Sequence, residues 1–153
     1  MNRIIGVDLG EKRIGIAIAD VDGAATPLTT LRRGRTPEAD AAALLRIVAE
    51  QGATEVIVGL PLEATGTEGP QSAATRAWVE AVSGLVGLPF SWRDERLSSH
   101  LAEQRLGPMK RGRSGGAPSK TQRDAYRARV DREAATIILQ DELDARAQAG
   151  GAR

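Results

Sequence analysis

The first 31 residues contain three short apolar segments separated by polar turns, and this pattern is the strongest constraint on the fold. Residues 4–9 form an apolar run, and residues 13–19 alternate large with small side chains after a turn around Gly10. A second turn, at Asp22-Gly23, precedes a third segment at residues 26–31. Short apolar segments with such turns are typical of strands joined by hairpins. We therefore predict an antiparallel meander at the start of the chain.

The rest of the chain alternates helical with strand patterns. Thr36-Pro37 is a typical helix start, and a stripe of apolar residues with helical spacing follows it until Gly52. We predict further helices over residues 72–86, 98–106 and 121–147, and strands over 55–59 and 89–94. This order predicts an α/β fold with a mixed five-stranded sheet flanked by helices, which is the element order of the ribonuclease H-like architecture.

Length and composition indicate one globular domain. The 153 residues are 41% hydrophobic and 27% charged, and we predict a single domain over residues 1–148 with a frayed tail at 149–153. The absence of cysteine excludes disulfides, cysteine–zinc sites and a thiol nucleophile, and the single histidine disfavours multi-histidine metal sites. Because no segment approaches the length of a membrane span and the N-terminus lacks a signal-peptide core, we expect a cytoplasmic protein with no membrane partner.

Positive charge is concentrated in one part of the chain. Between Arg105 and Glu133 there are nine cations and three anions, a local charge of +6, so the remaining residues carry −5. This segment includes a glycine-rich basic loop at about residues 108–120, which we predict to be mobile. The asymmetry favours a polyanionic partner, although a solvated helix face would also explain it.

Three acidic residues stand at the ends of predicted elements that such a fold would bring together. Asp8 ends the first apolar run and Glu95 follows the fifth strand, while Asp131 shares its side of the last helix with apolar residues three, four and seven positions further on. Clustered carboxylates repel one another unless they are protonated or neutralised by cations. Oxygen ligands without cysteine or several histidines favour Mg²⁺ or Mn²⁺ over zinc. The sequence therefore predicts a divalent-metal site at these three acids, and we expect it to bind two ions.

Each acid also has a simpler interpretation. Asp8 could close the turn that follows it or cap a backbone amide. Glu95 could pair with Arg93 or Arg96 on the surface. Asp131 could pair with Arg127 one helical turn before it. These alternatives stay open at the level of the sequence, but the three acids together are more specific than any one of them.

Four ordered motifs resemble those of the YqgF/RuvX family of ribonuclease H-like proteins, which are described as pre-16S rRNA nucleases or as Holliday-junction-resolvase-like. The likeness covers about residues 3 to 143, and its motifs are Ile5–Gly10, Val58–Leu62 with Gly66–Glu68, Asp94–Ser98, and Val130-Asp131 ahead of Ala134-Ala135 and Ile138–Gln140. The resemblance implies that Asp8, Glu95 and Asp131 are the catalytic, metal-binding triad of a nuclease that matures the 5′ end of 16S rRNA. Two departures are Arg129, where relatives often carry lysine, and the long basic loop.

The expected enzyme is a nuclease that hydrolyses phosphodiester bonds with Mg²⁺ or Mn²⁺, and its expected partners are nucleic acid, with RNA favoured over DNA, and ribosomal precursor particles. Two alternatives remain: a branched-DNA resolvase or other DNA nuclease, and a non-catalytic RNA-binding assembly or transcription factor. For contacts with substrate phosphates the candidates are cations near the motifs and in the basic segment: Lys12, Arg96, Arg111, Arg113 and Arg129.

Overall fold

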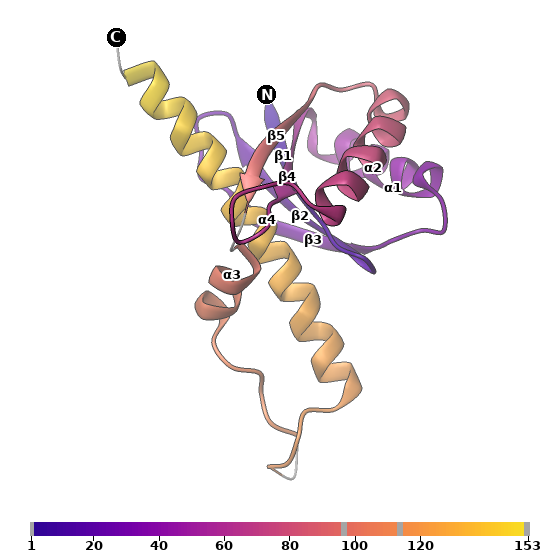
Figure 1. Ribbon diagram of the computed structural model, residues 1–153, viewed down its shortest axis with the longest axis vertical. Coiled ribbons are helices and arrows are strands. Elements are labelled where there is room, and N and C mark those ends of the chain that lie inside the picture. The colour runs from indigo at the N-terminus through magenta and orange to yellow at the C-terminus, as the bar shows by residue number, and fades with distance from the viewer. Residues whose placement is uncertain (1, 96–97, 113–114, 152–153) are drawn as a thin grey trace.

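The computed structural model describes residues 2–95, 98–112 and 115–151 (Figure 1). Its elements, in chain order, are β1 (Arg3–Leu9), β2 (Arg13–Asp20), β3 (Thr26–Arg32), α1 (Pro37–Gln51), β4 (Ala53–Pro61), α2 (Pro70–Val86), β5 (Phe90–Glu95), α3 (Ser98–Leu106) and α4 (Lys120–Gly151). Each predicted helix and strand is present, and most of the predicted ends lie within two residues of the observed ones.

The five strands form one mixed sheet in the order β3-β2-β1-β4-β5. The first three strands pair antiparallel, as the hairpin pattern predicts, while β4 pairs parallel with both β1 and β5. The predicted α/β class with a mixed five-stranded sheet is confirmed. In this order β1 is the middle strand. Because β1, β4 and β5 are adjacent and parallel, their carboxyl ends meet at one edge of the sheet.

Helix α1 begins and ends as its sequence predicts. The Thr36 hydroxyl accepts a hydrogen bond from the Ala39 amide at 3.2 Å, and Pro37 occupies the first turn. At the other end Gly52 adopts a left-handed conformation with φ of 67°, which glycine reaches without steric cost.

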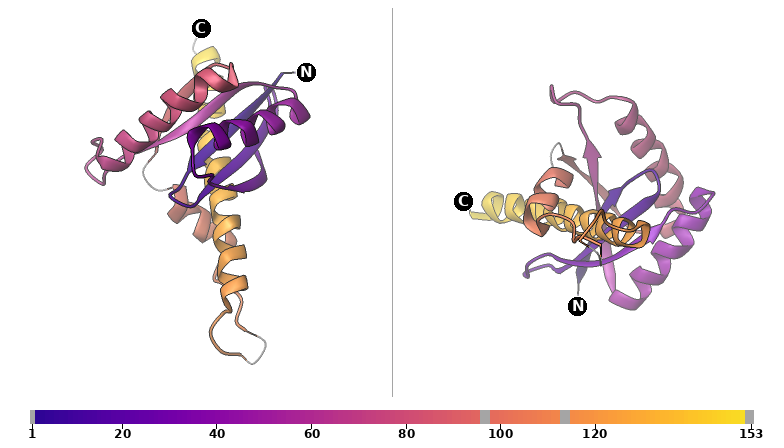
Figure 2. Two further views of the ribbon diagram at one scale, coloured as in Figure 1. Left: turned by 90° about the vertical axis from the view of Figure 1, so that its right-hand side faces the viewer. Right: turned by 90° about the horizontal axis from the view of Figure 1, so that it is seen from below.

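Helices cover both faces of the sheet (Figure 2). Helices α1 and α2 pack on one face, against a core that includes Ile5, Val7 and Ile16, whereas α4 crosses the other face over Ile4 and Ile57. Burying these apolar side chains contributes roughly 1.5–3 kcal/mol each, so the two cores hold the three layers together. The strand alternation therefore assigns every second residue of β1 to the α4 side.

Three glycines allow α4 to lie directly on the sheet. A Cβ atom at Gly6 would come within 2.7 Å of the Leu139 Cβ atom, and one at Gly59 would come within 2.5 Å of the Ile138 side chain. On β2 the approach is closer still, because a Cβ atom at Gly15 would lie 1.9 Å from the backbone carbonyl oxygen of Asp131. Small residues on this face thus determine how near Asp131 comes to the strands.

The N-terminal half of α4 projects beyond the sheet, together with residues 107–112 and 115–119 of the connection to α3 (Figures 1 and 2). Helix α3 packs on α4 through Ala102 and Val130, and the Tyr126 hydroxyl donates to the Gly107 carbonyl at 2.7 Å. At the other end α4 continues to Gly151, past the predicted end at Ala147 and through the described part of the tail predicted to be frayed. Residues 141–149 have good helix propensity and include no proline, which explains the extension.

No helix in residues 2–95, 98–112 or 115–151 is long and apolar enough to cross a lipid bilayer.

Candidate active site

Asp8 lies near the end of the central strand β1, on the face that α4 covers. Side chains alternate along a strand, so Asp8 shares its face with Ile4 and Gly6, while Val7 and Leu9 belong to the core on the opposite face. Among the described residues no hydrogen bond reaches the Asp8 carboxylate, so the turn-closing interpretation of this residue finds no support.

Glu95 and Asp131 come to the same place from two other elements. Glu95 is the last residue of β5, and the Leu62 amide, just after β4, donates to its carbonyl at 2.8 Å. Asp131 lies on α4 directly above Gly15, the residue that pairs with Asp8 across the β1–β2 ladder. Three elements far apart in the sequence therefore bring the three predicted acids to one edge of the sheet.

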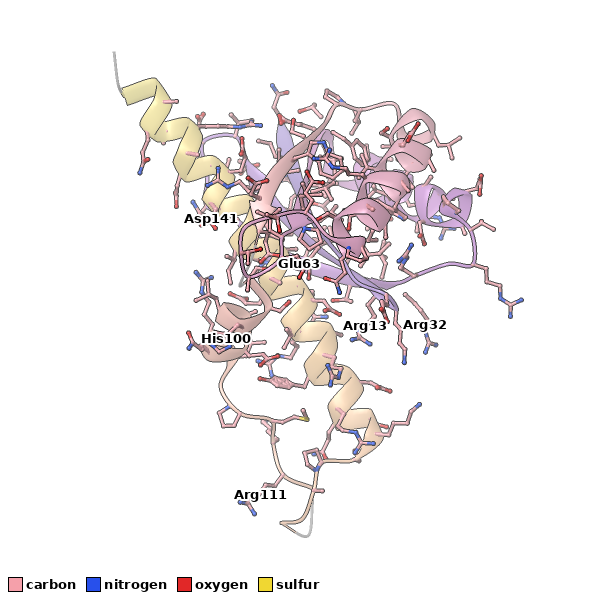
Figure 3. All side chains as sticks on the ribbon, in the orientation of Figure 1. Arg13, Arg32, Glu63, His100, Arg111 and Asp141 are labelled. Carbon is pink, nitrogen blue, oxygen red and sulfur yellow. The ribbon has the colours of Figure 1, made fainter. Side chains whose placement is uncertain are left out.

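The three acids line a single open cavity of about 650 Å³. Its walls come from the ends of β1, β4 and β5, the starts of α2 and α3, and α4 at Asp131. The residues facing the cavity are Asp8, Leu9, Gly10, Glu11, Arg33, Gly59, Pro61, Leu62, Pro70, Gln71, Ala74, Thr75, Glu95, Ser99, His100 and Asp131. His100 is an exposed residue of α3 (Figure 3), and its ring nitrogen lies 3.3 Å from the Gln104 amide nitrogen, as a surface helix residue would.

The electrostatics of the cavity are concentrated on Asp8. Burial raises the pKa of the Asp8 carboxyl to about 7, and the negative charges of Glu95 and Asp131 add to the effect. Both causes disfavour the charged form of the carboxylate. A divalent cation bound there would offset them, because its positive charge stabilises the ionised carboxylate.

Arg13, the first residue of β2, holds Asp131. Its Nε atom donates to Asp131 Oδ2 at 2.6 Å, and both side chains are largely shielded, with 27% and 17% of their surface exposed. The alternative in which Asp131 pairs with Arg127 is therefore wrong. The reason is that helix α4 turns Asp131 toward the sheet, whereas Arg127 is exposed and lies beside the end of the β2–β3 hairpin.

Glu95 is also engaged by a protein donor. The Ser98 amide at the start of α3 donates a hydrogen bond to Glu95 Oε1. Its neighbour Arg93 pairs instead with Glu142 at 3.7 Å, so the surface pairing with Arg93 is wrong. Arg96, the other suggested partner, lies outside the described residues.

The donor set suits a hard divalent cation, but the ligands are not preassembled. Carboxylate oxygens from three elements face one cavity, with neither cysteine nor a second histidine to favour a softer metal. Within the described ranges, however, no group of three or more His, Cys, Asp or Glu side chains stands close enough to hold one ion. Two of the acids are instead occupied by Arg13 and the Ser98 amide, each through one oxygen. Their second oxygens, Asp131 Oδ1 and Glu95 Oε2, accept no hydrogen bond from the described residues.

The cations predicted to bind substrate are dispersed. Lys12 is exposed in the turn between β1 and β2, and Arg129 is exposed on α4, but neither lines the cavity with the acids. Arg111 is exposed at the far end of the projecting segment, where it donates to the Gly115 carbonyl at 3.2 Å (Figure 3). Arg96 and Arg113 lie outside the described residues.

Two arginines that sequence reasoning missed lie closer to the acids. Arg33 lines the cavity, and its guanidinium donates to the Gly10 carbonyl at 3.1 Å and lies 3.7 Å from the buried Asp40. Arg13 could have been found, because it stands two residues before Gly15 and therefore on the α4 face of β2. The sequence contains no comparable pattern for Arg33. Its position at the cavity depends on the path of the chain after the end of β3.

Comparisons with known proteins agree with this geometry. Residues 2–145 match the family described as "RuvX: Holliday junction resolvase". A protein of Chloroflexus aggregans, named "Putative pre-16S rRNA nuclease", is 44% identical over 144 residues, which are 94% of each chain. A protein of the same name from Anaeromyxobacter dehalogenans is 42% identical over 146 residues, 95% of this chain and 98% of the relative.

The solved structure of Thermus thermophilus RuvC in complex with a Holliday junction substrate has a similar fold. The TM-score is 0.50 at 17% sequence identity, over 95% of this chain and 96% of that one. At this identity the likeness concerns the fold alone, which is ribonuclease H-like, as the order of the elements predicts. Together with the match over residues 2–145, these findings show that the chain belongs to the RuvX family.

Proposed function

We propose that this chain is a metal-dependent nuclease that hydrolyses phosphodiester bonds in the 5′ leader of precursor 16S rRNA. One observation carries the chemical part of the proposal: Asp8, Glu95 and Asp131 face one cavity, and the pKa of Asp8 rises to about 7 because that carboxylate is buried beside the other two. Clusters of mutually repelling acids in a cavity are arrangements that active sites use to bind cations or move protons.

The three acids are the residues that would hold Mg²⁺ or Mn²⁺. When bound at such carboxylates, one or two of these ions polarise the phosphate and lower the pKa of a water molecule that can attack it. Asp8 has both oxygens available among the described residues, while Glu95 and Asp131 each keep one. The chain thus offers oxygen ligands from three sides without breaking the contacts to Arg13 and the Ser98 amide.

Arg33 supplies positive charge on the wall of the same cavity. Its guanidinium is fixed by the Gly10 carbonyl and lies beside the Asp40 carboxylate, which also accepts a hydrogen bond from the Trp78 indole at 3.0 Å. A guanidinium fixed in this way matches the geometry of a phosphate group. We assign Arg33 the role of orienting the phosphate that enters the cavity.

The names of the relatives support RNA as the substrate. Proteins 42–44% identical to this chain over nearly its whole length are named as pre-16S rRNA nucleases. The family description, Holliday junction resolvase, supports the second candidate, cleavage of branched DNA. Cations do not distinguish the two, because they recognise phosphate, and only the ribose 2′-hydroxyl separates RNA from DNA.

A cleavage assay with four substrates tests the proposal. Wild type, Asp8→Asn and the control Asp141→Asn, which changes an exposed acid further along α4 (Figure 3), are each incubated with Mg²⁺ or Mn²⁺. The substrates are a precursor 16S rRNA 5′ fragment, single-stranded RNA, single-stranded DNA and a four-way DNA junction. We expect wild type and Asp141→Asn to cut the rRNA fragment and leave 5′-phosphate ends, and Asp8→Asn to be inactive.

Other outcomes would change the assignment. Preferential cutting of the junction would replace rRNA maturation by branched-DNA resolution. Binding of RNA without cleavage by any variant would favour a non-catalytic assembly factor. Undiminished cleavage by Asp8→Asn would remove these acids from the active site.

A further inference from the structure

A second hollow of about 850 Å³ lies beside the catalytic cavity, between the end of the β2–β3 hairpin and the N-terminal half of α4. We call it the basic groove. Glu11 lines both the basic groove and the catalytic cavity, and Arg13, which lines the groove, is bonded to Asp131 of the cavity. The two hollows are therefore neighbours along the same side of the sheet.

Positive charge dominates the basic groove. Its charged lining residues are two acids and five cations, the cations being Lys12, Arg13, Arg32, Lys120 and Arg127. Arg13 and Arg32 are paired in the β2–β3 ladder, which brings both side chains to the same end of the hairpin (Figure 3).

Three of the five cations have no acidic partner in the described part of the chain. Arg13 pairs with Asp131, and Lys120 lies 3.8 Å from Asp124. Lys12, Arg32 and Arg127 are exposed, and no described carboxylate lies within ion-pair distance of them. Three unpaired cations around one groove repel each other, and a ligand with several negative charges would relieve that repulsion.

The uncharged part of the lining excludes a base-stacking role. It consists of Thr30, Leu31 and Ala128, so the groove has no aromatic ring on which a base could stack. Contacts of lysine and arginine with phosphates hold the sugar–phosphate backbone and are independent of base sequence.

We propose that the basic groove holds the phosphodiester backbone of the nucleic-acid substrate on one side of the scissile phosphate, with Lys12, Arg32 and Arg127 contacting successive phosphates. This inference rests on the proposed nuclease function and adds the path that the nucleic-acid strand takes to the catalytic cavity. It assigns Arg127 of α4, rather than Arg129, to the substrate, because Arg127 lines the groove and Arg129 does not.

The salt dependence of binding tests the proposal without any cleavage. Fluorescent single-stranded RNA, single-stranded DNA and duplex DNA of about 20 nucleotides are titrated with Asp8→Asn protein in EDTA at several salt concentrations. The slope of log K against log salt is negative, and each lost phosphate contact reduces its magnitude by about 0.7 for single strands and about 0.9 for duplexes. Adding Arg32→Gln and Arg127→Gln should therefore reduce the magnitude of the slope by about 1.4 on single strands and about 1.8 on duplex DNA.

The matched control is Arg46→Gln, which removes an exposed arginine from α1 on the opposite side of the sheet. It should leave the slope unchanged. An unchanged slope in the double variant, or an equal loss in Arg46→Gln, would overturn the proposal. Comparison of the three nucleic acids shows whether the groove prefers RNA, single-stranded DNA or a duplex.

Neutral linkages in the nucleic acid locate the contacts. Single methylphosphonates, which lack the phosphate charge, are placed at successive positions of the RNA that wild type binds. Neutral linkages opposite Arg32 and Arg127 should weaken binding about fivefold in the Asp8→Asn protein and have no further effect once both arginines are replaced, whereas a linkage opposite Lys12 should still weaken it. Equal effects in both proteins would place the backbone elsewhere.

The two proposals fail in different ways. If wild type cuts no nucleic acid but the magnitude of the slope still falls in the double variant, the groove assignment stands and the nuclease assignment falls. If wild type cuts normally and the slope does not change, the substrate reaches the catalytic cavity by another path.

Discussion

Gly15 of β2 lies beneath Asp131 of α4, so close that a Cβ atom on the glycine would stand 1.9 Å from the aspartate's carbonyl oxygen. The contact is between backbone atoms, which cannot move aside as the end of a flexible side chain can. Because Gly15 pairs with Asp8 across the β1–β2 ladder, one glycine determines how closely two of the three acids approach.

Replacing Gly15 by alanine should lift α4 from the sheet at this point. We expect a loss of about 2–3 kcal/mol in the free energy of unfolding, as for other overpacked sites, and weaker Mn²⁺ binding because Asp131 is displaced. Chemical denaturation and calorimetric titration with Mn²⁺ measure the two effects. The control is Gly84→Ala in α2, where a Cβ atom meets nothing within 4 Å and alanine should stabilise the helix by about 0.5–1 kcal/mol. Equal behaviour of the two variants would contradict the close approach.

The Arg13–Asp131 ion pair supplies positive charge that a bound cation could also supply. Arg13→Gln should lower the free energy of unfolding of the metal-free protein by about 1–3 kcal/mol, because it leaves a shielded carboxylate unpaired. Addition of Mn²⁺ should then raise the Tm of Arg13→Gln more than that of wild type. Thermal melts with and without Mn²⁺ decide this, with the exposed Arg46→Gln as control. A smaller metal-dependent rise in Arg13→Gln would indicate that the arginine assists metal binding by orienting Asp131.

The raised pKa of Asp8 predicts how the stability of the metal-free protein depends on pH. An acid whose folded-state pKa is about 7, against 3.8 in the unfolded chain, binds its proton more tightly in the native state. Its favourable contribution is complete below about pH 4 and is lost as the pH rises through 7. Asp8→Asn lacks this loss, so in EDTA it should be more stable than wild type at pH 8, by roughly 2–4 kcal/mol.

Urea denaturation of both proteins between pH 4 and pH 8 measures this difference. The excess stability of Asp8→Asn should shrink toward pH 4, and excess Mn²⁺ at pH 8 should reduce it by stabilising only wild type. A difference that is independent of pH would mean that Asp8 titrates normally.

Much of this structure could be predicted from the sequence, for identifiable physical reasons. Turn residues and capping signals such as Thr36-Pro37 and Gly52 are local, so the elements and their ends follow from short windows of sequence. The alternation in β1 puts Asp8 on the face of Ile4 and Gly6, and the apolar residues after Asp131 indicate that this residue faces inward.

Most of the contacts that could not be predicted are those between elements that are far apart in the sequence and meet only in the folded protein. Arg127 was an available partner for Asp131 by helical spacing, but the distance between α4 and β2 at Gly15 made Arg13 the partner instead. The basic groove is likewise invisible in the sequence, because Arg32 and Arg127 belong to segments that meet only when α4 packs beside the β2–β3 hairpin. The engagement of Glu95 by the Ser98 amide was also unforeseen, since it depends on where α3 begins relative to the end of β5.

The most direct test of the metal-nuclease site is the rate of Mn²⁺-dependent cleavage of the precursor 16S rRNA fragment by Asp8→Asn, Glu95→Gln, Asp131→Asn and the control Asp141→Asn. Each of the first three variants removes a charged oxygen ligand from the cavity, and each should lower the rate at least about 100-fold while the protein stays folded. Asp141→Asn should cleave at the wild-type rate. Loss of activity in all three, with the control unaffected, is the predicted result; cleavage near the wild-type rate by any of the three would contradict the assignment of these acids as one site.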